Sequence, residues 1–155
     1  MSRDDGGGDD RRDAENDVGE DDSGLPAPAP DQSPETAAFW EATADDRLLV
    51  RSCADCGAAF HPPRAICPEC HSDATEWIEA GGRGTVYTYS VMRQNHGPFG
   101  EAVPYVLAYV ELEEGPRLLT NVVGVDVEDV EVGQEVRVTF EDTGDGTKLP
   151  RFTPV

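Results

Sequence analysis

Residues Cys53–Cys70 read CADCGAAFHPPRAICPEC and contain the only four cysteines of the 155-residue chain. The cysteines form two Cys-x-x-Cys pairs that are separated by ten residues. This spacing is typical of a zinc ribbon, in which two tight turns each present two thiolates to one tetrahedral Zn²⁺. Gly57 suits a turn that needs a positive φ, and Pro68 stiffens the second turn. The pattern therefore predicts one structural zinc ion bound by Cys53, Cys56, Cys67 and Cys70.

Two other interpretations of the cysteines stay open from the residues alone. The first is a pair of disulfides in a small secreted domain, which is disfavoured because no secretory signal is recognisable ahead of Cys53. The second is a redox-active Cys-x-x-Cys motif, which is disfavoured because two copies lie so close together.

Four side chains around the cysteines have expected structural roles. Phe60 and Ile66 are expected to pack beneath the metal. His61 and His71 are not needed as ligands, because four thiolates already complete a structural site. We expect both histidines to be ordinary surface or hydrogen-bonded residues.

The charge of the chain limits its partners. Acidic residues outnumber basic residues by 32 to 12, and the formal net charge is −20. We interpret this composition as halophilic, that is, as adaptation to a high-salt cytoplasm where screening weakens self-repulsion. An ordinary acidic protein with an acidic tail is the alternative. A nucleic-acid partner is disfavoured because binding to phosphates depends on Lys and Arg, and no apolar run reaches the length of a transmembrane helix.

The chain divides into four segments. Residues 1–32 are rich in Asp, Glu, Gly and Pro, and they should form a disordered acidic tail and linker because they have little apolar surface to bury. The three following segments are a helical segment, the zinc ribbon and a β domain, at residues 33–50, 51–78 and 79–155.

Ser33-Pro34-Glu35 has the features of a helix start. Ser is a good N-cap, Pro fits the first helical position, and Glu suits the positive end of the helix dipole. The helix is expected to run to about Ala44, with Phe39 and Trp40 as its only large apolar residues. These two are either core side chains that pack on the ribbon or exposed anchors for a protein partner, since aromatic residues dominate binding hot spots.

Residues 79–155 alternate between apolar and polar side chains, as β-strands do. The candidate strands cover residues 85–92, 106–112, 117–123, 136–141 and 149–152. Five short strands with Gly-rich turns fit a small closed barrel, and the OB-fold is the favoured type. Gly81-Gly82-Arg83-Gly84 is interpreted as a hinge and barrel bend, because a phosphate loop would need a Gly-Lys-Ser/Thr and a following helix. The predicted fold is mainly β, with an N-terminal helix, a rubredoxin-like zinc ribbon and a C-terminal five-stranded OB-fold barrel.

The order of these motifs resembles the DUF35 family of zinc-ribbon and OB-fold proteins over about residues 33–155. Besides the Phe-Trp helix and the cysteine pairs, the resemblance rests on Pro62-Pro63-Arg64, Trp77, Gly82-Arg83-Gly84-Thr85-Val86-Tyr87 and Pro104-Tyr105. It implies a role in acyl-CoA metabolism beside thiolase-like enzymes. In archaea such a protein bridges acetyl-CoA acetyltransferase and hydroxymethylglutaryl-CoA synthase in the mevalonate route. In bacteria, related domains partner steroid-CoA hydratases and aldolases.

The chain itself shows no pattern of catalytic residues. With zinc bound it has no free cysteine, and its three histidines have no patterned nucleophile beside them. His96 lies in a long loop of the β domain, where a plain loop histidine is favoured over a general base. We therefore expect a cytoplasmic, non-catalytic scaffold that binds a thiolase-type acyltransferase and hydroxymethylglutaryl-CoA synthase, with Phe39 and Trp40 as candidate partner contacts.

Three further possibilities stay open: direct contact with a CoA thioester, nucleic-acid binding, and a role as an acyl-CoA-binding enzyme subunit. Candidate contacts to CoA phosphates are Arg64, Arg83 and Arg93, with ordinary surface arginines as the alternative. A nucleic-acid-binding OB module would stack bases on Tyr87, Tyr89, Tyr105 and Tyr109, although the charge of the chain opposes it. An acyl-CoA-binding enzyme subunit would need an acid or base that converges on a pocket.

Overall fold

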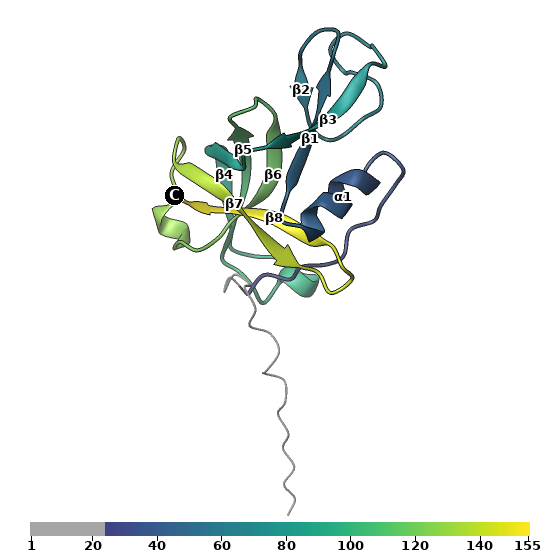
Figure 1. Cartoon of the computed structure of the whole chain (residues 1–155). Helices are drawn as coiled ribbons and strands as arrows, with labels where there is room; N and C mark the ends of the chain where they lie inside the picture. Colours follow the sequence, from purple (N-terminus) through teal and green to yellow (C-terminus); the bar gives the residue numbers. More distant parts are fainter. Residues whose placement is uncertain (1–23) are drawn as a thin grey trace, which may run out of the picture.

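The computed structural model describes residues 24–155 and confirms the predicted mainly β architecture (Figure 1). Within these residues, a three-stranded sheet stands beside one α-helix and a closed five-stranded barrel. The helix and the small sheet are α1 (Ala37–Ala44), β1 (Leu48–Cys53), β2 (Ala59–Phe60) and β3 (Thr75–Ala80). The barrel strands are β4 (Arg83–Met92), β5 (Tyr105–Leu112), β6 (Arg117–Val122), β7 (Glu135–Asp142) and β8 (Lys148–Pro154). Short 3-10 helices η2 (Gly97–Phe99) and η3 (Val127–Asp129) lie in the loops.

The helix begins later than the sequence predicts. The Ser33 carbonyl accepts hydrogen bonds from the N–H groups of Thr36 and Ala37 at 3.0 and 2.9 Å, which forms a turn before α1. Thr36 is the N-cap residue, and it makes no side-chain cap bond. Glu35 instead accepts a hydrogen bond from the N–H of Ala65 at 3.0 Å. The predicted capping role is therefore wrong, because Ser33 lies in a turn before the helix and Glu35 ties the helix entrance to the ribbon.

The helix is fixed to the barrel from its inner face. Phe39 is 4% exposed and packs edge-on against Trp40, with ring centroids 4.8 Å apart. Thr43 is fully buried, and its hydroxyl accepts a hydrogen bond from the backbone N–H of Lys148 in β8 at 3.1 Å. Phe39 is thus a core residue, which leaves Trp40 as the member of the pair that keeps some exposed surface.

The three-stranded sheet has an apolar base and a cysteine-bearing tip. Its order is β2-β1-β3, and β1 pairs with β3 from Leu48↔Ala80 to Cys53↔Thr75. Leu48, Val50 and Ala80 belong to the same core cluster as the inward side chains of the barrel. The base of the ribbon is therefore packed as part of the barrel core, while the tip projects beyond it (Figure 1).

The barrel has the strand order β4-β5-β6-β8-β7, closed by antiparallel pairing of β4 with β7. A single parallel pair, Val122↔Phe152, joins β6 to β8. The predicted alternation over residues 85–92 is wrong after Val86, because the register shifts between Val86 and Thr88. This bulge leaves both Tyr87 and Thr88 exposed.

Gly84 allows β4 to approach its neighbours closely. A Cβ atom at this position would lie 2.5 Å from the backbone oxygen of Glu111 and 2.9 Å from a methyl group of Val110. Only glycine fits such a contact without a shift of the β5 backbone. This agrees with the predicted barrel bend at residues 81–84.

The expected linker is ordered where the structure describes it. Leu25 is 8% exposed and packs with Tyr105 and Val123 on the barrel. The carbonyl of Pro26 accepts a hydrogen bond from the buried guanidinium of Arg151. This stretch packs on the barrel because its leucine and its carbonyls find partners there. The rest of the predicted acidic tail, residues 1–23, lies outside the described residues.

Candidate metal centre

Two turns of similar geometry carry the four cysteines. The N–H of Gly57 donates to the carbonyl of Cys53 at 2.9 Å, and the N–H of His71 donates to the carbonyl of Cys67 at 2.9 Å. Both residues that follow a cysteine pair have positive φ, 80° for Gly57 and 66° for His71. The sequence signals this need at Gly57 only, since a histidine at positive φ is uncommon.

The turns also direct backbone N–H groups at sulfur. The N–H of Cys56 donates to Sγ of Cys53 at 3.5 Å, and the N–H of Glu69 donates to Sγ of Cys67 at 3.3 Å. Such bonds favour the thiolate over the thiol, because they stabilise negative charge on sulfur. The backbone N–H of Cys56 is the main reason why the pKa of Cys53 falls to about 7.

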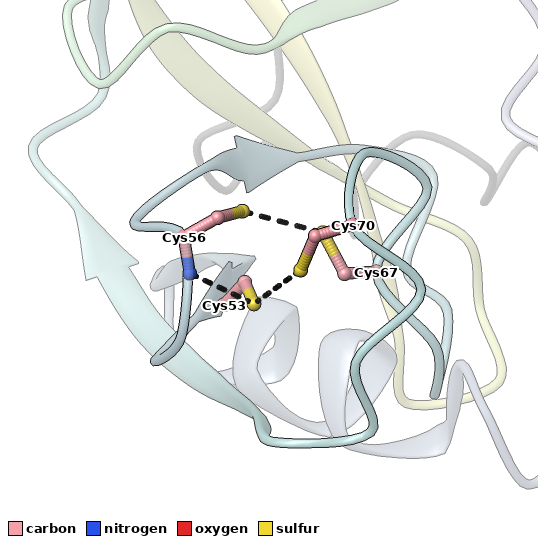
Figure 2. Close-up of side chains that lie close together, drawn as sticks. All are labelled: Cys53, Cys56, Cys67 and Cys70. Carbon is pink, nitrogen blue, oxygen red and sulfur yellow. Dashed lines mark hydrogen bonds between the residues drawn. The ribbon is translucent and has the colours of Figure 1, made fainter.

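The four sulfurs converge on one point (Figure 2). All four Sγ atoms lie within 4.8 Å of one another, with Cys53 and Cys70 at 3.6 Å and Cys56 and Cys67 at 3.7 Å. Four sulfurs at about 2.3 Å from one tetrahedral ion would lie about 3.8 Å apart, so the cluster fits a metal of zinc's size. A disulfide needs sulfurs at about 2.05 Å. All four cysteines are free, which contradicts the disulfide alternative.

The cluster needs a cation to become fully ionised. A backbone hydrogen bond from Ser72 lowers the pKa of Cys70, but burial and the neighbouring sulfurs outweigh it and raise this pKa to about 12. One thiolate therefore forms readily at the Cys53 side, while further thiolates are opposed by the charge beside them. A bound dication removes this opposition, and four sulfur ligands leave no coordination position for water or substrate.

The packing around the metal centre differs from the prediction at one residue. Phe60 is 7% exposed and packs with Cys53, Cys67 and Ala58, as predicted. Ile66 is 48% exposed, so its predicted place beneath the metal is wrong. The small side chain of Ala58 packs against the cluster of Cys53, Phe60 and Cys67.

The candidate CoA contacts are not brought together. Arg64 is exposed in the loop between β2 and β3. Arg83 begins β4, whereas Arg93 follows the other end of that strand and pairs with Glu128 at 2.8 Å. His96 is exposed in the loop before η2. These residues therefore form no common phosphate site in the structure.

A groove between the ribbon, α1 and the barrel is a feature that sequence reasoning missed. It has a volume of about 450 Å³, and its walls include Trp40, His61 and Leu119. Burial lowers the pKa of His61 to about 4, and its Nδ1 has no hydrogen-bond partner in the described structure. The Pro62-Pro63 motif forms one edge of the groove, but nothing in the sequence placed that motif next to β6.

No helix in residues 24–155 is long and apolar enough to span a membrane.

Two known protein families match the chain, one over the ribbon and one over the barrel. The family described as "ChsH2, rubredoxin-like zinc ribbon domain" matches residues 40–76. The family described as "ChsH2, C-terminal OB-fold domain" matches residues 77–141. A solved structure described as "Ltp2-ChsH2(DUF35) aldolase" has a chain 38% identical to this one, with a TM-score of 0.73, and the match covers 81% of this chain and 98% of that one.

Several curated proteins are similar to the chain over most of its described length. A "DUF35 domain-containing scaffold protein" of Methanocaldococcus jannaschii is 41% identical over 71% of this chain and 93% of its own length. A "Benzoylsuccinyl-CoA thiolase subunit BbsA" of Thauera aromatica is 29% identical over 80% of this chain and 91% of its own length. A "Probable enoyl-CoA hydratase alpha subunit" of Thermomonospora curvata is 42% identical over 76% of this chain, but the match spans only 37% of that longer protein. The chain therefore belongs to the DUF35 family, whose members combine a zinc ribbon with an OB-fold domain.

Proposed function

We propose that the protein is a non-catalytic scaffold subunit that assembles with a thiolase-type acyltransferase. One observation carries the proposal: the chain aligns with almost the whole length of proteins named as scaffolds or as a thiolase subunit. The matches cover 93% and 91% of the length of those two proteins, so the whole of each subunit, rather than one of its domains, is similar to this chain. The hydratase relatives contain the same unit within a longer protein, so their activity does not carry over to it.

The metal centre fits a supporting role. Cys53, Cys56, Cys67 and Cys70 would hold one Zn²⁺. A closed four-sulfur site supplies folding energy and no Lewis-acid or hydrolytic chemistry. The ion would fix the tip of the ribbon relative to α1 and the barrel, and a subunit that presents several surfaces to larger partners needs that rigidity.

The second partner that we propose is hydroxymethylglutaryl-CoA synthase. The support is the resemblance to archaeal members of the family together with a composition that suits a high-salt cytoplasm. The coupling has a physical reason, because condensation of two acetyl-CoA molecules is unfavourable by itself. Direct transfer of acetoacetyl-CoA to the favourable synthase step would draw the condensation forward. The two modules, ribbon and barrel, give such a bridge two different faces to present.

Co-expression tests both parts of the proposal. The full chain is produced with the thiolase-type acyltransferase of its own organism, with and without the synthase, and each mixture is separated by size-exclusion chromatography in molar salt. We expect co-elution with the acyltransferase and a larger complex when the synthase is added. A chain that elutes alone and leaves the coupled rate of both enzymes unchanged would contradict the scaffold function. Co-elution with the acyltransferase alone would contradict only the bridge to the synthase.

A variant on the helix refines this test. Because Phe39 is a core residue, replacing both helix aromatics would confound binding with folding. Trp40→Ala removes the aromatic side chain that lines the groove and leaves Phe39 in place. If Trp40 contacts the acyltransferase, this variant should bind more weakly while it stays folded and keeps its bound zinc. The loss of its ring contact with Phe39 should lower its thermal stability without unfolding it.

A further inference from the structure

The outer face of β4, β5 and β6 carries an unusual concentration of exposed apolar side chains. Of the seven large hydrophobic residues exposed in the described structure, four lie on these three strands. They are Tyr87 at 47%, Leu107 at 36%, Tyr109 at 44% and Leu119 at 58% exposure. We call these four residues the barrel patch.

Contacts across the strands show that these side chains share one face. Tyr109 and Leu119 are directly opposite partners in the β5–β6 pairing. The guanidinium of Arg117 lies 3.8 Å from the ring centroid of Tyr87, and it bridges to Glu111 of β5 at 3.2 Å. Side chains from all three strands therefore meet on the outside of the barrel.

The barrel patch is electrically neutral on a strongly acidic chain. The charged side chains at the outward positions of β4 to β6 are Arg83, at the start of β4, and Glu111 and Arg117, which form an ion pair. The whole chain carries 32 acidic and 12 basic residues, so such a face stands out from its surroundings. An exposed apolar patch with a polar or charged rim is a typical feature of a protein interaction site.

The patch continues into the groove beside α1. Leu119 lines the groove together with Trp40 and His61, while its neighbour Tyr109 lies on the outer face. The groove therefore offers a recess next to a flatter apolar surface, which is the usual form of a binding hot spot. Nδ1 of His61 is buried without a hydrogen-bond partner in the described structure. A polar side chain of a partner that enters the groove could therefore form a hydrogen bond with this atom.

We infer that the barrel patch and the adjoining groove form the docking surface for the thiolase-type acyltransferase; this rests on the proposed function. The fitting partner surface is apolar at its centre, with neutral or basic residues around it that complement the acidic surroundings of the patch. OB-folds bind nucleic acid on the corresponding second and third strands. Here the outer face has only two cations among the described residues, Arg83 and Arg117, and Arg117 is already paired. Of the four candidate stacking tyrosines, Tyr105 is buried. A second copy of the chain is disfavoured, because it would bring like acidic surroundings into close contact, where salt screens charges least.

Charge substitutions in the patch test this inference. The full chain carrying Tyr109→Asp or Leu119→Asp is titrated with the purified acyltransferase of its own organism in molar salt, and the dissociation constant is measured by biolayer interferometry. We expect binding at least about tenfold weaker for each variant, as for the loss of a hot-spot side chain. The matched control is Val132→Asp, which introduces the same charge at a residue 65% exposed in the loop before β7. It should bind as the wild type does.

The outcomes separate the two proposals. If the wild type binds and both patch variants bind equally well, the docking surface is wrong and the scaffold function stands. If the wild type does not bind the acyltransferase, the scaffold function falls and the docking surface falls with it. Single-stranded DNA binding, or a homodimer seen by sedimentation, that disappears in Tyr109→Asp would also overturn the inference. Leu119→Thr, a milder change that favours a strand, should weaken binding in the same direction if the Asp variants lose thermal stability.

Discussion

The tip of the ribbon and the barrel reach their folded states by different means. The buried cluster at the tip consists of Cys53, Phe60 and Cys67, and two of these three residues are candidate metal ligands. The cluster centred on the barrel contains fourteen buried residues. So small an apolar cluster cannot offset the entropy of ordering two turns and a loop. The barrel is therefore stabilised by apolar burial, and we expect the tip to depend on a metal ion bound by its four cysteines.

The boundary between these two regimes runs through the ribbon. Leu48 and Val50 in the first half of β1 are buried with the barrel core, whereas Cys53 at the end of the same strand faces the metal centre. One strand therefore contributes to both regions, and its first half packs in the same core cluster as Phe39 of α1. We therefore expect that the two regions can be destabilised separately.

Removal of the metal should have the largest effect. Structural zinc sites contribute on the order of 10 kcal/mol to the folding of the segments that they hold. In the chelated protein or in Cys67→Ser, we expect amides of residues 53–74 to lose protection from hydrogen exchange while β5 and β6 remain protected. Addition of zinc to the chelated wild type should restore protection, and zinc added to Cys67→Ser should not. Uniform loss of protection across the barrel would show that the two regions fold as one unit.

Truncation in the barrel core should have the next largest effect, in the opposite region. Phe152 is fully buried and pairs with both Val122 of β6 and Val138 of β7. Phe152→Ala should lower the free energy of unfolding by about 3–5 kcal/mol, because a cavity remains where the ring was. Chemical denaturation measures this loss, and metal analysis of the folded fraction should still find one zinc per chain. Val132→Ala, at an exposed position, is the matched control and should change stability by less than about 0.5 kcal/mol.

The same contrast explains what could be predicted from the sequence. The metal cluster was predictable residue by residue, because Cys-x-x-Cys spacing encodes a local geometry that needs no distant contact. The barrel was predictable as a set of strands, because inward residues such as Val106, Ala108 and Val110 alternate with outward ones.

What could not be predicted depends on contacts between distant segments. Ser33 and Glu35 have the pattern of a helix start, but a turn and the Ala65 N–H of the ribbon compete for their polar groups. The bulge after Val86 breaks an alternation that looks regular in the sequence. The groove arises where His61, Trp40 and Leu119 meet, and no local pattern connects these three residues.

A pH titration probes the junction between the two regions through His61. Burial keeps its pKa in the folded protein at about 4, below the ordinary value of 6.5 in an unfolded chain. The unfolded chain therefore binds a proton that the folded chain excludes, so His61 should reduce stability as pH falls from 6.5 to 4 and have no further effect below 4. After allowance for partial exposure, the loss should be about 2 kcal/mol.

Matched variants isolate this contribution from the effect of acid on the carboxylates and the metal. The difference in unfolding free energy between wild type and His61→Gln should shift in favour of the variant across this pH range. His96→Gln, at an exposed loop histidine, should follow the wild type. A constant difference between wild type and His61→Gln from pH 7 to pH 4 would show that the histidine is not held neutral in the groove.

The smallest expected effect separates the two turns within the metal centre itself. Gly57 and His71 occupy equivalent positions after each cysteine pair, with φ of 80° and 66°. Gly57→Ala should cost about 1 kcal/mol, and the cost should come from the backbone alone because no atom lies within 4 Å of the new Cβ position. His71→Gly should relieve a similar strain but add chain entropy, which leaves a net gain of about 0.5 kcal/mol. Competition with a chromogenic zinc chelator reports both changes as shifts in zinc affinity, weaker for Gly57→Ala and tighter for His71→Gly. If both substitutions weakened zinc binding, His71 would have to stabilise its turn through its side chain, and the two turns would not be equivalent.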